Sequence, residues 1–252
     1  MKFFEEDHRY VNNSESYISV STLLKKLEPK KDWDEIAKKY AKKNNLTVAE
    51  VKAKWELEKD NSIVRGKKFH AVSEAKDLNS EFAAVFSDPS LSPRAVFAPE
   101  IVDGVKIGGA QLLEEGIYPE LLVWLNSLKI AGQIDRCEII NNTVNIIDYK
   151  TNKKIETSSF VNRLGVSEKM LPPCAHLDNC NFNKYALQLN FYAYIVLRNN
   201  PGYSLGKMIL KHIKFENPEN PDEATEVIDY ILPDLQKEIY LITEAYKNNQ
   251  LK

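Results

Sequence analysis

"IAGQIDRCEIINNTVNIIDYKT", residues 130–151, decides the fold because its two Ile-rich halves predict two interior β-strands joined by a tight turn. Asn141 and Asn142 tolerate the positive φ angles that a two-residue hairpin turn requires. If they form that turn, Asp135 faces Asp148 across the hairpin. Lys150 lies two residues beyond Asp148 and therefore on the same face, since side chains alternate along a strand.

Two facing carboxylates in an apolar hairpin require a shared proton or a cation, because like charges on directly opposed residues repel. Val144, Ile146 and Ile147 surround Asp148 and indicate that it is buried. A carboxylate pair with one ammonium suits a hard divalent metal, with the lysine beside it for a water or a phosphate oxygen. On these three residues alone, a solvated sheet face is an equally good interpretation.

Composition limits the class of protein. A chain of 252 residues is long enough for one large domain. Its formal net charge of −2 excludes a globally basic nucleic-acid binder, so any basic surface must be local. Three cysteines without framework spacing fit a reducing compartment. The acidic start resembles no signal or transit peptide, and no apolar run approaches the roughly 20 residues of a membrane span. We expect an intracellular, cytoplasmic protein of a bacterium or a phage-infected host.

The rest of the chain predicts an α/β order of elements. Ser21 and Thr22 are N-cap candidates for an early helix, and Pro233 suits the first turn of a closing helix. A hairpin is expected at 8–20, two helices within 32–60 that join near Asn44 and Asn45, another helix at 62–78, loops at 87–100 and 170–183, strands near 120–124, 129–140, 143–150 and 207–215, and helices near 183–199 and 233–248.

Five elements in order carry a resemblance to a known family: Gly66-Lys67-Lys68-Phe69-His70, Glu120, Gly132-x-x-Asp135, Asp148-Tyr149-Lys150, and Gln188 with Tyr192. Over about residues 16–200 the chain resembles the PD-(D/E)xK nuclease superfamily, and within it the RecB-like exonucleases, including mitochondrial genome maintenance exonucleases and phage relatives. The resemblance implies a restriction-endonuclease-like α/β fold, a mixed sheet flanked by helices. It also implies a single nuclease domain over 1–252, with a helical elaboration at about 20–65 over the cleft, a core at 66–215 and a C-terminal helix within 216–252.

The resemblance further implies a metal-dependent DNA nuclease, expected to be an exonuclease of DNA repair or recombination. Mg²⁺ or Mn²⁺ would be held by Asp135, Asp148, the Tyr149 backbone carbonyl and His70. Lys150 would position the attacking water and offset charge that develops on the phosphate. The remaining catalytic candidates are the upstream acid Glu120, for which Glu100, Glu114 and Glu115 are alternatives, Gln188 near the metal, and Tyr192 in contact with DNA.

Each of these roles has a structural alternative. His70 is otherwise a satisfied structural histidine, and Gln188 and Tyr192 are otherwise packing residues of an apolar helix. Glu74 shares a helix face with His70, since the two are four residues apart, but it is interpreted as a solvated glutamate.

Local basic segments would explain how a chain with a net negative charge binds DNA. Between Lys25 and Lys43 there are eight lysines and four acids, and Trp33, Tyr40 and Trp55 interleave with these charges as candidate base-stacking residues. The expected DNA contacts are Arg65, Lys67 and Lys68, which precede His70, and Lys38, Lys39, Lys42 and Lys43. The resemblance suggests that the DNA is single-stranded or has free ends. Solvated lysines with core aromatics are the alternative.

Other classes of function fit less well. Three cysteines cannot supply the four ligands of an iron–sulfur cluster. Cys174, His176, Asp178 and Cys180 match no standard zinc finger, and no Gly-rich loop supports hydrolysis of small phosphoesters. A catalytically inactive nuclease fold that serves as a DNA-binding or scaffolding module is the alternative from another class. Protein partners are not indicated.

Overall fold

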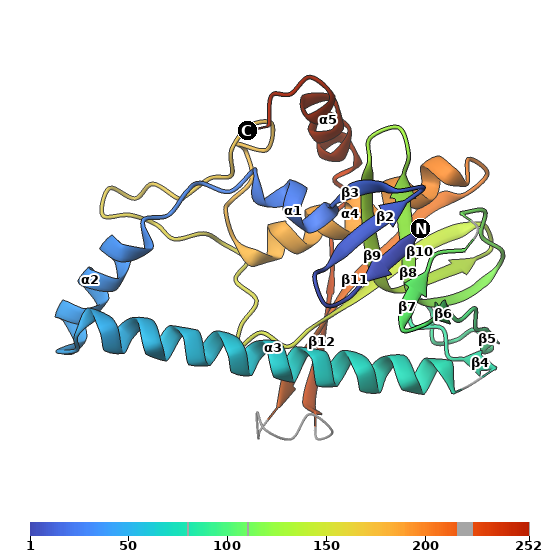
Figure 1. The fold of residues 1–252 in the computed structure, drawn as a ribbon, viewed down its shortest axis with the longest axis horizontal. Coiled ribbons are helices and arrows are strands. Elements are labelled where there is room, and N and C mark those ends of the chain that lie inside the picture. The colour runs from blue at the N-terminus through green and yellow to red at the C-terminus, as the bar shows by residue number, and fades with distance from the viewer. Residues whose placement is uncertain (80, 110, 216–223, 252) are drawn as a thin grey trace.

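The computed structural model describes residues 1–79, 81–109, 111–215 and 224–251, so part of the predicted C-terminal region, residues 216–223 and 252, lies outside the described residues. The described chain is a mixed α/β fold with one large sheet flanked by helices, which confirms the predicted class (Figure 1). The strands are β1 (Lys2–Phe4), β2 (Arg9–Asn12), β3 (Glu15–Ser19), β4 (Phe82–Ala83), β5 (Arg94–Ala95), β6 (Glu100–Val102), β7 (Val105–Ile107), β8 (Gly116–Leu125), β9 (Ile130–Ile140), β10 (Thr143–Lys150), β11 (Ser204–Phe215) and β12 (Ala224–Ile231). The helices are α1 (Val20–Lys25), α2 (Trp33–Asn44), α3 (Val48–Leu78), α4 (Asn181–Asn199) and α5 (Gln236–Lys247).

The hairpin of β9 and β10 has the predicted turn and register. Asn141 and Asn142 adopt φ angles of 51° and 57°. The antiparallel ladder then runs from Thr143 opposite Ile140 to Ile147 opposite Arg136. One further step in this register brings Asp148 opposite Asp135, as the sequence predicts.

Strand β9 shares one of its edges between two neighbours. β3 pairs with it in parallel at Ile130 and Ala131, and β10 pairs with it in antiparallel from Arg136 onward. β8 follows the other edge along most of the strand. Residues 132–135 therefore lie between two ladders on the shared edge. The sheet order among the described strands is β12-β11-β10-β9-β3-β2-β1-β7-β6, with β8 beside β9.

The main core lies between the sheet and α4, which packs on β8, β9, β10 and β11 and against α1 and α5. Leu187, Leu189 and Phe191 of α4 are fully buried in it, as its apolar pattern predicts. Phe69 of α3 instead packs on a separate cluster that includes Ile147. Figure 1 shows α2 and the N-terminal half of α3 extending beyond the sheet. None of the helices in the described ranges has the length and apolar composition needed to cross a bilayer.

Helix α3 is one continuous element, whereas the sequence predicted a break near residue 60. Its start is fixed by a capping box in which Thr47 and Glu50 bond each other's backbone amides. Ser62, at the expected break, donates its hydroxyl to the Glu58 carbonyl at 2.7 Å and so remains helical. The side chain of His70 is therefore carried on a helix that is anchored far from it.

The predicted ends of two other helices were wrong. Ser19, and not Ser21 or Thr22, caps α1, because its Oγ accepts the Thr22 amide at 3.0 Å. α5 begins at Gln236 instead of near Pro233, since buried Asn190 holds the preceding segment by accepting from the Leu235 amide and donating to the Pro233 carbonyl. Strands β1, β4, β5, β6, β7 and β12 were not predicted, and β5 lies within the segment 87–100 that was expected to be a loop.

Candidate metal centre

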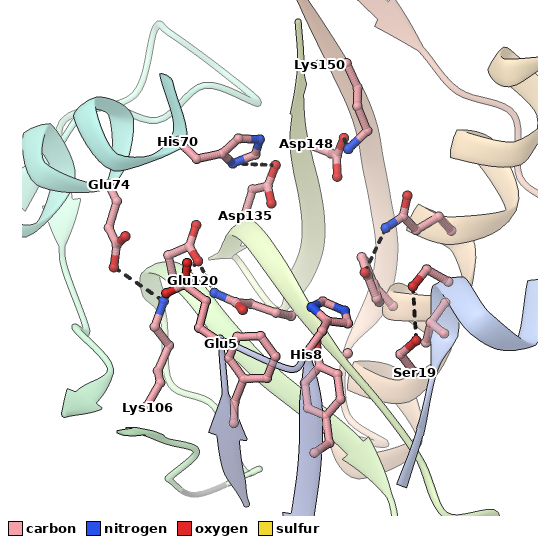
Figure 2. A pocket seen from close by; sticks show the side chains of 18 residues that line it. Glu5, His8, Ser19, His70, Glu74, Lys106, Glu120, Asp135, Asp148 and Lys150 are labelled. Atoms are coloured by element: carbon pink, nitrogen blue, oxygen red, sulfur yellow. Dashed lines mark hydrogen bonds and ion pairs between the residues drawn. The ribbon is translucent and has the colours of Figure 1, made fainter. Parts of the chain in front are cut away.

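A pocket of about 280 Å³ lies beside residues 132–135 of β9 (Figure 2). Residues of α3 line one side, and the β1–β2 turn and the start of α1 line another. All six predicted catalytic residues line this pocket together with His70: Glu120, Asp135, Asp148, Lys150, Gln188 and Tyr192. Tyr149 is not among its lining residues, and its side chain packs against Phe69 in another cluster. Metal binding by the Tyr149 backbone carbonyl stays a prediction.

Three adjacent strands bring three carboxylates to this pocket. On β8, Glu120 lies between Pro119 and Leu121, which pair with Arg136 and Ile134 of β9. That register puts Glu120 opposite Asp135 on one side of β9, just as the hairpin register puts Asp148 opposite it on the other. Strand β8 begins at Gly116, so Glu120 lies in the middle of a strand and does not open it as predicted.

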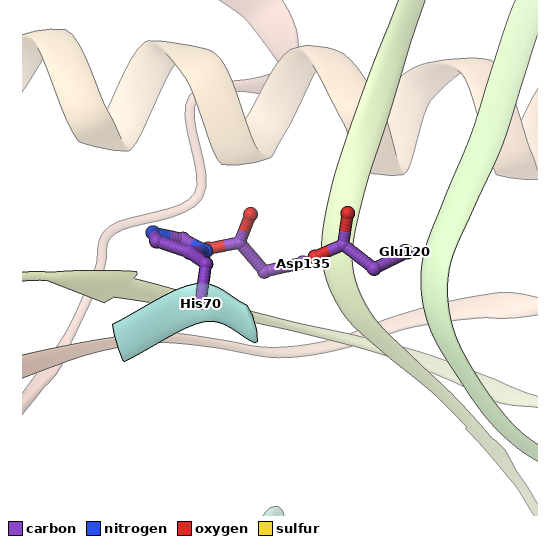
Figure 3. Close-up of side chains that lie close together, drawn as sticks. All are labelled: His70, Glu120 and Asp135. Atoms are coloured by element: carbon purple, nitrogen blue, oxygen red, sulfur yellow. The ribbon is translucent and has the colours of Figure 1, made fainter. Parts of the chain in front are cut away.

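Where the β9–β10 ladder ends, the Asp135 side chain accepts a backbone hydrogen bond that a main-chain carbonyl would otherwise accept. Its Oδ2 accepts the Tyr149 amide hydrogen at 2.9 Å and lies 3.5 Å from Nδ1 of His70. His70, Glu120 and Asp135 each offer one ligand atom, and these atoms all lie within 4.8 Å of one another. Figure 3 shows Asp135 between the other two side chains. One imidazole and two carboxylates are a set of ligands that can hold a divalent metal ion.

Asp148 adds a buried carboxylate to the pocket. The residue is 2% exposed, and its Oδ2 has no hydrogen-bond partner among the described residues. That oxygen forms an ion pair with Lys150 Nζ at 2.5 Å. Burial raises the pKa of Asp148 to about 6, the charge of Asp135 adds to this, and Lys150 opposes it. A buried carboxylate in this state fits a site that is completed by a cation.

Lys150 remains a cation in this environment. Burial lowers the pKa of its ammonium, but the negative charges of Asp148 and Asp135 outweigh that effect and raise the pKa above its ordinary value. Its Nζ also lies 5.1 Å from the ring centre of Tyr185 on α4. The ammonium therefore stays charged next to the group of carboxylates, as the predicted role requires.

Glu120 is held in an unusual conformation. Its φ is +52°, a left-handed value that costs a non-glycine residue about 1–3 kcal/mol and is typical of functional sites. Burial raises its pKa to about 7, with a contribution from Asp135. Its Oε2 accepts from Gln133 and lies 3.1 Å from Nζ of Lys106.

Two side chains that contact Glu120, those of Lys106 and Gln133, were not identified from the sequence, and the prediction for Glu74 was wrong. Lys106 lies on the short strand β7 after Asp103-Gly104, a turn signal that predicts a hairpin but not its place in the sheet. Gln133 lies inside the Gly132-x-x-Asp135 motif. Glu74 is not the solvated residue expected, because its side chain lines the pocket and forms an ion pair with Lys106 at 3.5 Å.

Gly132 and the two α4 residues form one packed unit. A Cβ atom at Gly132 would overlap the ring of Tyr192. Tyr192 is 5% exposed, and its hydroxyl accepts from Gln188 Nε2 at 2.9 Å. Burial raises the pKa of Tyr192 well above its ordinary value. The packing interpretation is thus confirmed, since Tyr192 packs α4 against β9 at the pocket, whereas the functional roles of Gln188 and Tyr192 stay predictions.

The predicted DNA contacts lie outside the pocket. Lys67 and Lys68 are exposed on α3, and Arg65 donates to the Thr151 carbonyl at 3.2 Å. The α2 lysines, defined as Lys38, Lys39, Lys42 and Lys43, are exposed on the helix that extends beyond the sheet. Trp33 is 61% exposed, and Trp33 and Tyr40 each contact Trp55 edge-on. DNA binding by these residues stays a prediction.

The cysteine segment does not form a metal site within the described ranges. Cys174 and Cys180 are free and buried, and His176 pairs with Glu238 at 3.1 Å. Among the residues that the structure describes, the group of three or more metal-ligating side chains is His70, Glu120 and Asp135.

Comparisons with known proteins agree with this geometry. A search of the curated proteins gave no match. A solved structure titled "Crystal structure of SSO0001" is 17% identical, with 98% of this chain and 82% of that chain covered and a TM-score of 0.34, which is too low to carry an argument. The family model of the PD-(D/E)XK nuclease superfamily matches residues 25–249. A mixed sheet flanked by helices is consistent with the restriction-endonuclease-like fold of that family. Because the match covers most of the chain, this protein belongs to the PD-(D/E)XK nuclease superfamily.

Proposed function

We propose that the protein is a divalent-metal-dependent deoxyribonuclease of the RecB-like branch that acts as an exonuclease on DNA with free ends. One observation carries the proposal: His70, Glu120 and Asp135 offer three ligand atoms within 4.8 Å of one another, in the pocket that also contains Asp148 and Lys150. Membership of the nuclease superfamily supplies the class of reaction.

The residues fit Mg²⁺ or Mn²⁺ as the resident ion. His70, Glu120 and Asp135 would hold it, and the buried carboxylate of Asp148 would lie next to it. A bound divalent ion lowers the pKa of a water molecule and polarises a phosphoryl oxygen. The Tyr192 ring, which packs on Gly132 of β9 and accepts a hydrogen bond from Gln188, would keep α4 fixed against this side of the pocket.

Lys150 would act on the phosphate. Its ammonium is held 2.5 Å from Asp148, on the face of β10 that lines the pocket. Negative charge develops on the phosphate oxygens during attack, and a fixed cation at that point stabilises the transition state more than the bound substrate. The same ammonium would orient the attacking water by donating a hydrogen bond to it.

The shape of the pocket favours a strand end as substrate. Figure 2 shows His70 and Glu74 on α3 at one side and His8 and Glu5 on the β1–β2 turn at another. A pocket that is walled on these sides suits a terminal nucleotide better than a continuous duplex. Exposed Lys67 and Lys68, next to His70 in sequence, would contact phosphates of a single strand that leads into it.

Digestion of end-labelled linear DNA and of closed circular DNA tests the proposal. We expect cleavage with Mg²⁺ or Mn²⁺, no cleavage in EDTA, release of mononucleotides or short products from linear single strands, and intact circles. Asp148→Asn should abolish cleavage and leave the circular dichroism spectrum unchanged. Asp229→Asn, at an exposed aspartate of β12, is the matched control and should retain full activity.

Three outcomes would contradict parts of the proposal. Cleavage that survives chelation would refute the metal role, and circles cut as fast as linear DNA would refute the exonuclease assignment. DNA binding without cleavage under every metal condition would instead support the inactive DNA-binding module.

A further inference from the structure

Lys106 lies inside the group of carboxylates and is not explained by the catalytic roles above. Its Nζ is 3.1 Å from Oε2 of Glu120 and 3.5 Å from Oε1 of Glu74. The lysine side chain is 13% exposed, and the side chain of Glu120 is 12% exposed. Figure 2 shows Lys106 reaching from β7 toward both glutamates. A buried ammonium between two carboxylates is a fixed positive charge in this pocket.

Glu120 belongs to two arrangements at once. It offers one of the three clustered ligand atoms with His70 and Asp135, and it also forms the ion pair with Lys106. Gln133 donates to the same Oε2 that faces the lysine. Lys106 and Gln133 therefore hold the carboxylate in place before any ion binds.

The balance of charges in the pocket indicates that Lys106 takes a position that a second cation could occupy. Five carboxylates line it, against the two ammonium groups of Lys106 and Lys150: Glu5, Glu74, Glu120, Asp135 and Asp148. Lys150 pairs with Asp148, and one divalent ion at the three-ligand group would use Asp135 and Glu120. A second divalent ion held through Glu120 would need a further carboxylate beside it, and Glu74, which shares Lys106 with Glu120, offers one. Lys106 already occupies the space between these two glutamates.

We infer that Lys106 stands in for a second metal ion, so that the site is a one-metal centre in which Lys106 positions Glu120. The inference rests on the proposed metal-dependent function and adds the number of ions and the residue that sets it. An ammonium fills the position permanently and is not lost by chelation, whereas a second divalent ion would have to be recruited from solution.

Titration of the whole protein with Mn²⁺, followed by calorimetry and by electron paramagnetic resonance, tests the inference without measuring catalysis. We expect the wild type to bind one Mn²⁺ per chain. Lys106→Met, which keeps the length of the side chain and removes its charge, should bind two ions. A unit charge about 6 Å from a divalent ion changes its affinity by about tenfold even at the dielectric constant of water. The first ion should therefore bind to this variant at least about tenfold more tightly.

Two control variants separate charge from general damage. Lys106→Arg keeps the positive charge and should still bind one ion. Lys211→Met removes a similarly buried lysine that pairs with Asp229 on β12, outside the pocket, and should behave as the wild type. If Lys106→Met fails to fold, Lys106→Gln removes the same charge with a polar side chain and should bind two ions in its place.

Several results would overturn the inference. Two equivalent Mn²⁺ ions in the wild type would do so directly, as would Lys106→Met with one ion and unchanged affinity. In either case metal-dependent DNA cleavage by the wild type would leave the proposed function intact. One ion in the wild type and two in Lys106→Met, without any DNA cleavage, would support the inference and refute the nuclease proposal. A wild type that binds no Mn²⁺ would refute both.

Discussion

Glu120→Gln should change how the stability of the metal-free protein depends on pH. Burial, with help from Asp135, raises the pKa of Glu120 to about 7 from an ordinary value of 4.5. The folded protein therefore holds this proton more tightly than the unfolded chain does. Between these two pKa values the folded state binds more protons, so stability falls as the pH rises through 7.

The size of the effect follows from the two pKa values. A difference of about 2.5 corresponds to about 3 kcal/mol, because each pKa unit is worth 1.36 kcal/mol. Between pH 5 and pH 8 the linkage relation gives about 2.5 kcal/mol of this loss. Glutamine cannot ionise, so the variant should lose about that much less stability over the same interval. The altered contacts with Lys106 and Gln133 are independent of pH and cancel when the two slopes are compared.

Urea denaturation in EDTA at pH 5, 6, 7 and 8 measures both slopes. Asp148 also has a raised pKa and contributes equally to the wild type and the variant. Glu114→Gln, at an exposed glutamate in the segment before β8, should retain the wild-type slope and serves as the control. Parallel pH profiles for the wild type and Glu120→Gln would refute the reasoning. Adding Mn²⁺ should stabilise the wild type more at high pH, where Glu120 is ionised, than at low pH. It should stabilise Glu120→Gln less than the wild type.

Lys150→Ala should reduce single-turnover cleavage by about 10²–10³, as for one preorganised electrostatic donor, and leave DNA affinity in Ca²⁺ nearly unchanged. A loss of affinity with an intact rate would make Lys150 a simple phosphate contact. Gly132→Ala should lower the free energy of unfolding by about 1–3 kcal/mol through overpacking, and adding Tyr192→Leu should recover part of it, as measured in urea. An unchanged midpoint for Gly132→Ala would contradict the close packing. Replacing the α2 lysines by alanine should weaken DNA binding and flatten its salt dependence by about 0.7–0.9 in the log–log slope per lost phosphate contact. Chemistry at saturating DNA should not change.

The hairpin could be predicted in detail because everything that sets it is local. The turn residues Asn141 and Asn142 fix the register of β9 and β10 over adjacent residues. The period of two along a strand then fixes which side chains share a face, and the ion pair of Asp148 with Lys150 agrees with it. Buried positions followed from the surrounding isoleucines for the same reason. The prediction succeeded because the residues that determine the turn and the register lie within one short segment.

Lys106 and Glu74 could not be predicted because their positions depend on distant pairings. β7 has three residues and reaches the sheet through β1, which lies more than a hundred residues away in the chain. Nothing near Lys106 in sequence indicates that Glu120 is its partner. Glu74 was treated as solvated because the helix pattern around it is polar. The pocket covers it because α3 packs beside β8, a contact between segments that are distant in the sequence.

The location of the centre follows from the interrupted edge of β9. A fully paired strand has its amides and carbonyls in two ladders, and the sheet leaves no room for an ion at that edge. Here β3 pairs with β9 as far as Ala131, and the pairing of β10 with β9 begins at Arg136. The stretch of β9 between these two ladders therefore has a pocket beside it. The Asp135 side chain accepts the Tyr149 amide that another strand would have bonded. The carboxylate is therefore positioned by the sheet itself and not only by its rotamer. Its neighbours Glu120 and Asp148 are placed by the registers on either side, so the spacing of the three acids is as rigid as the strands that carry them.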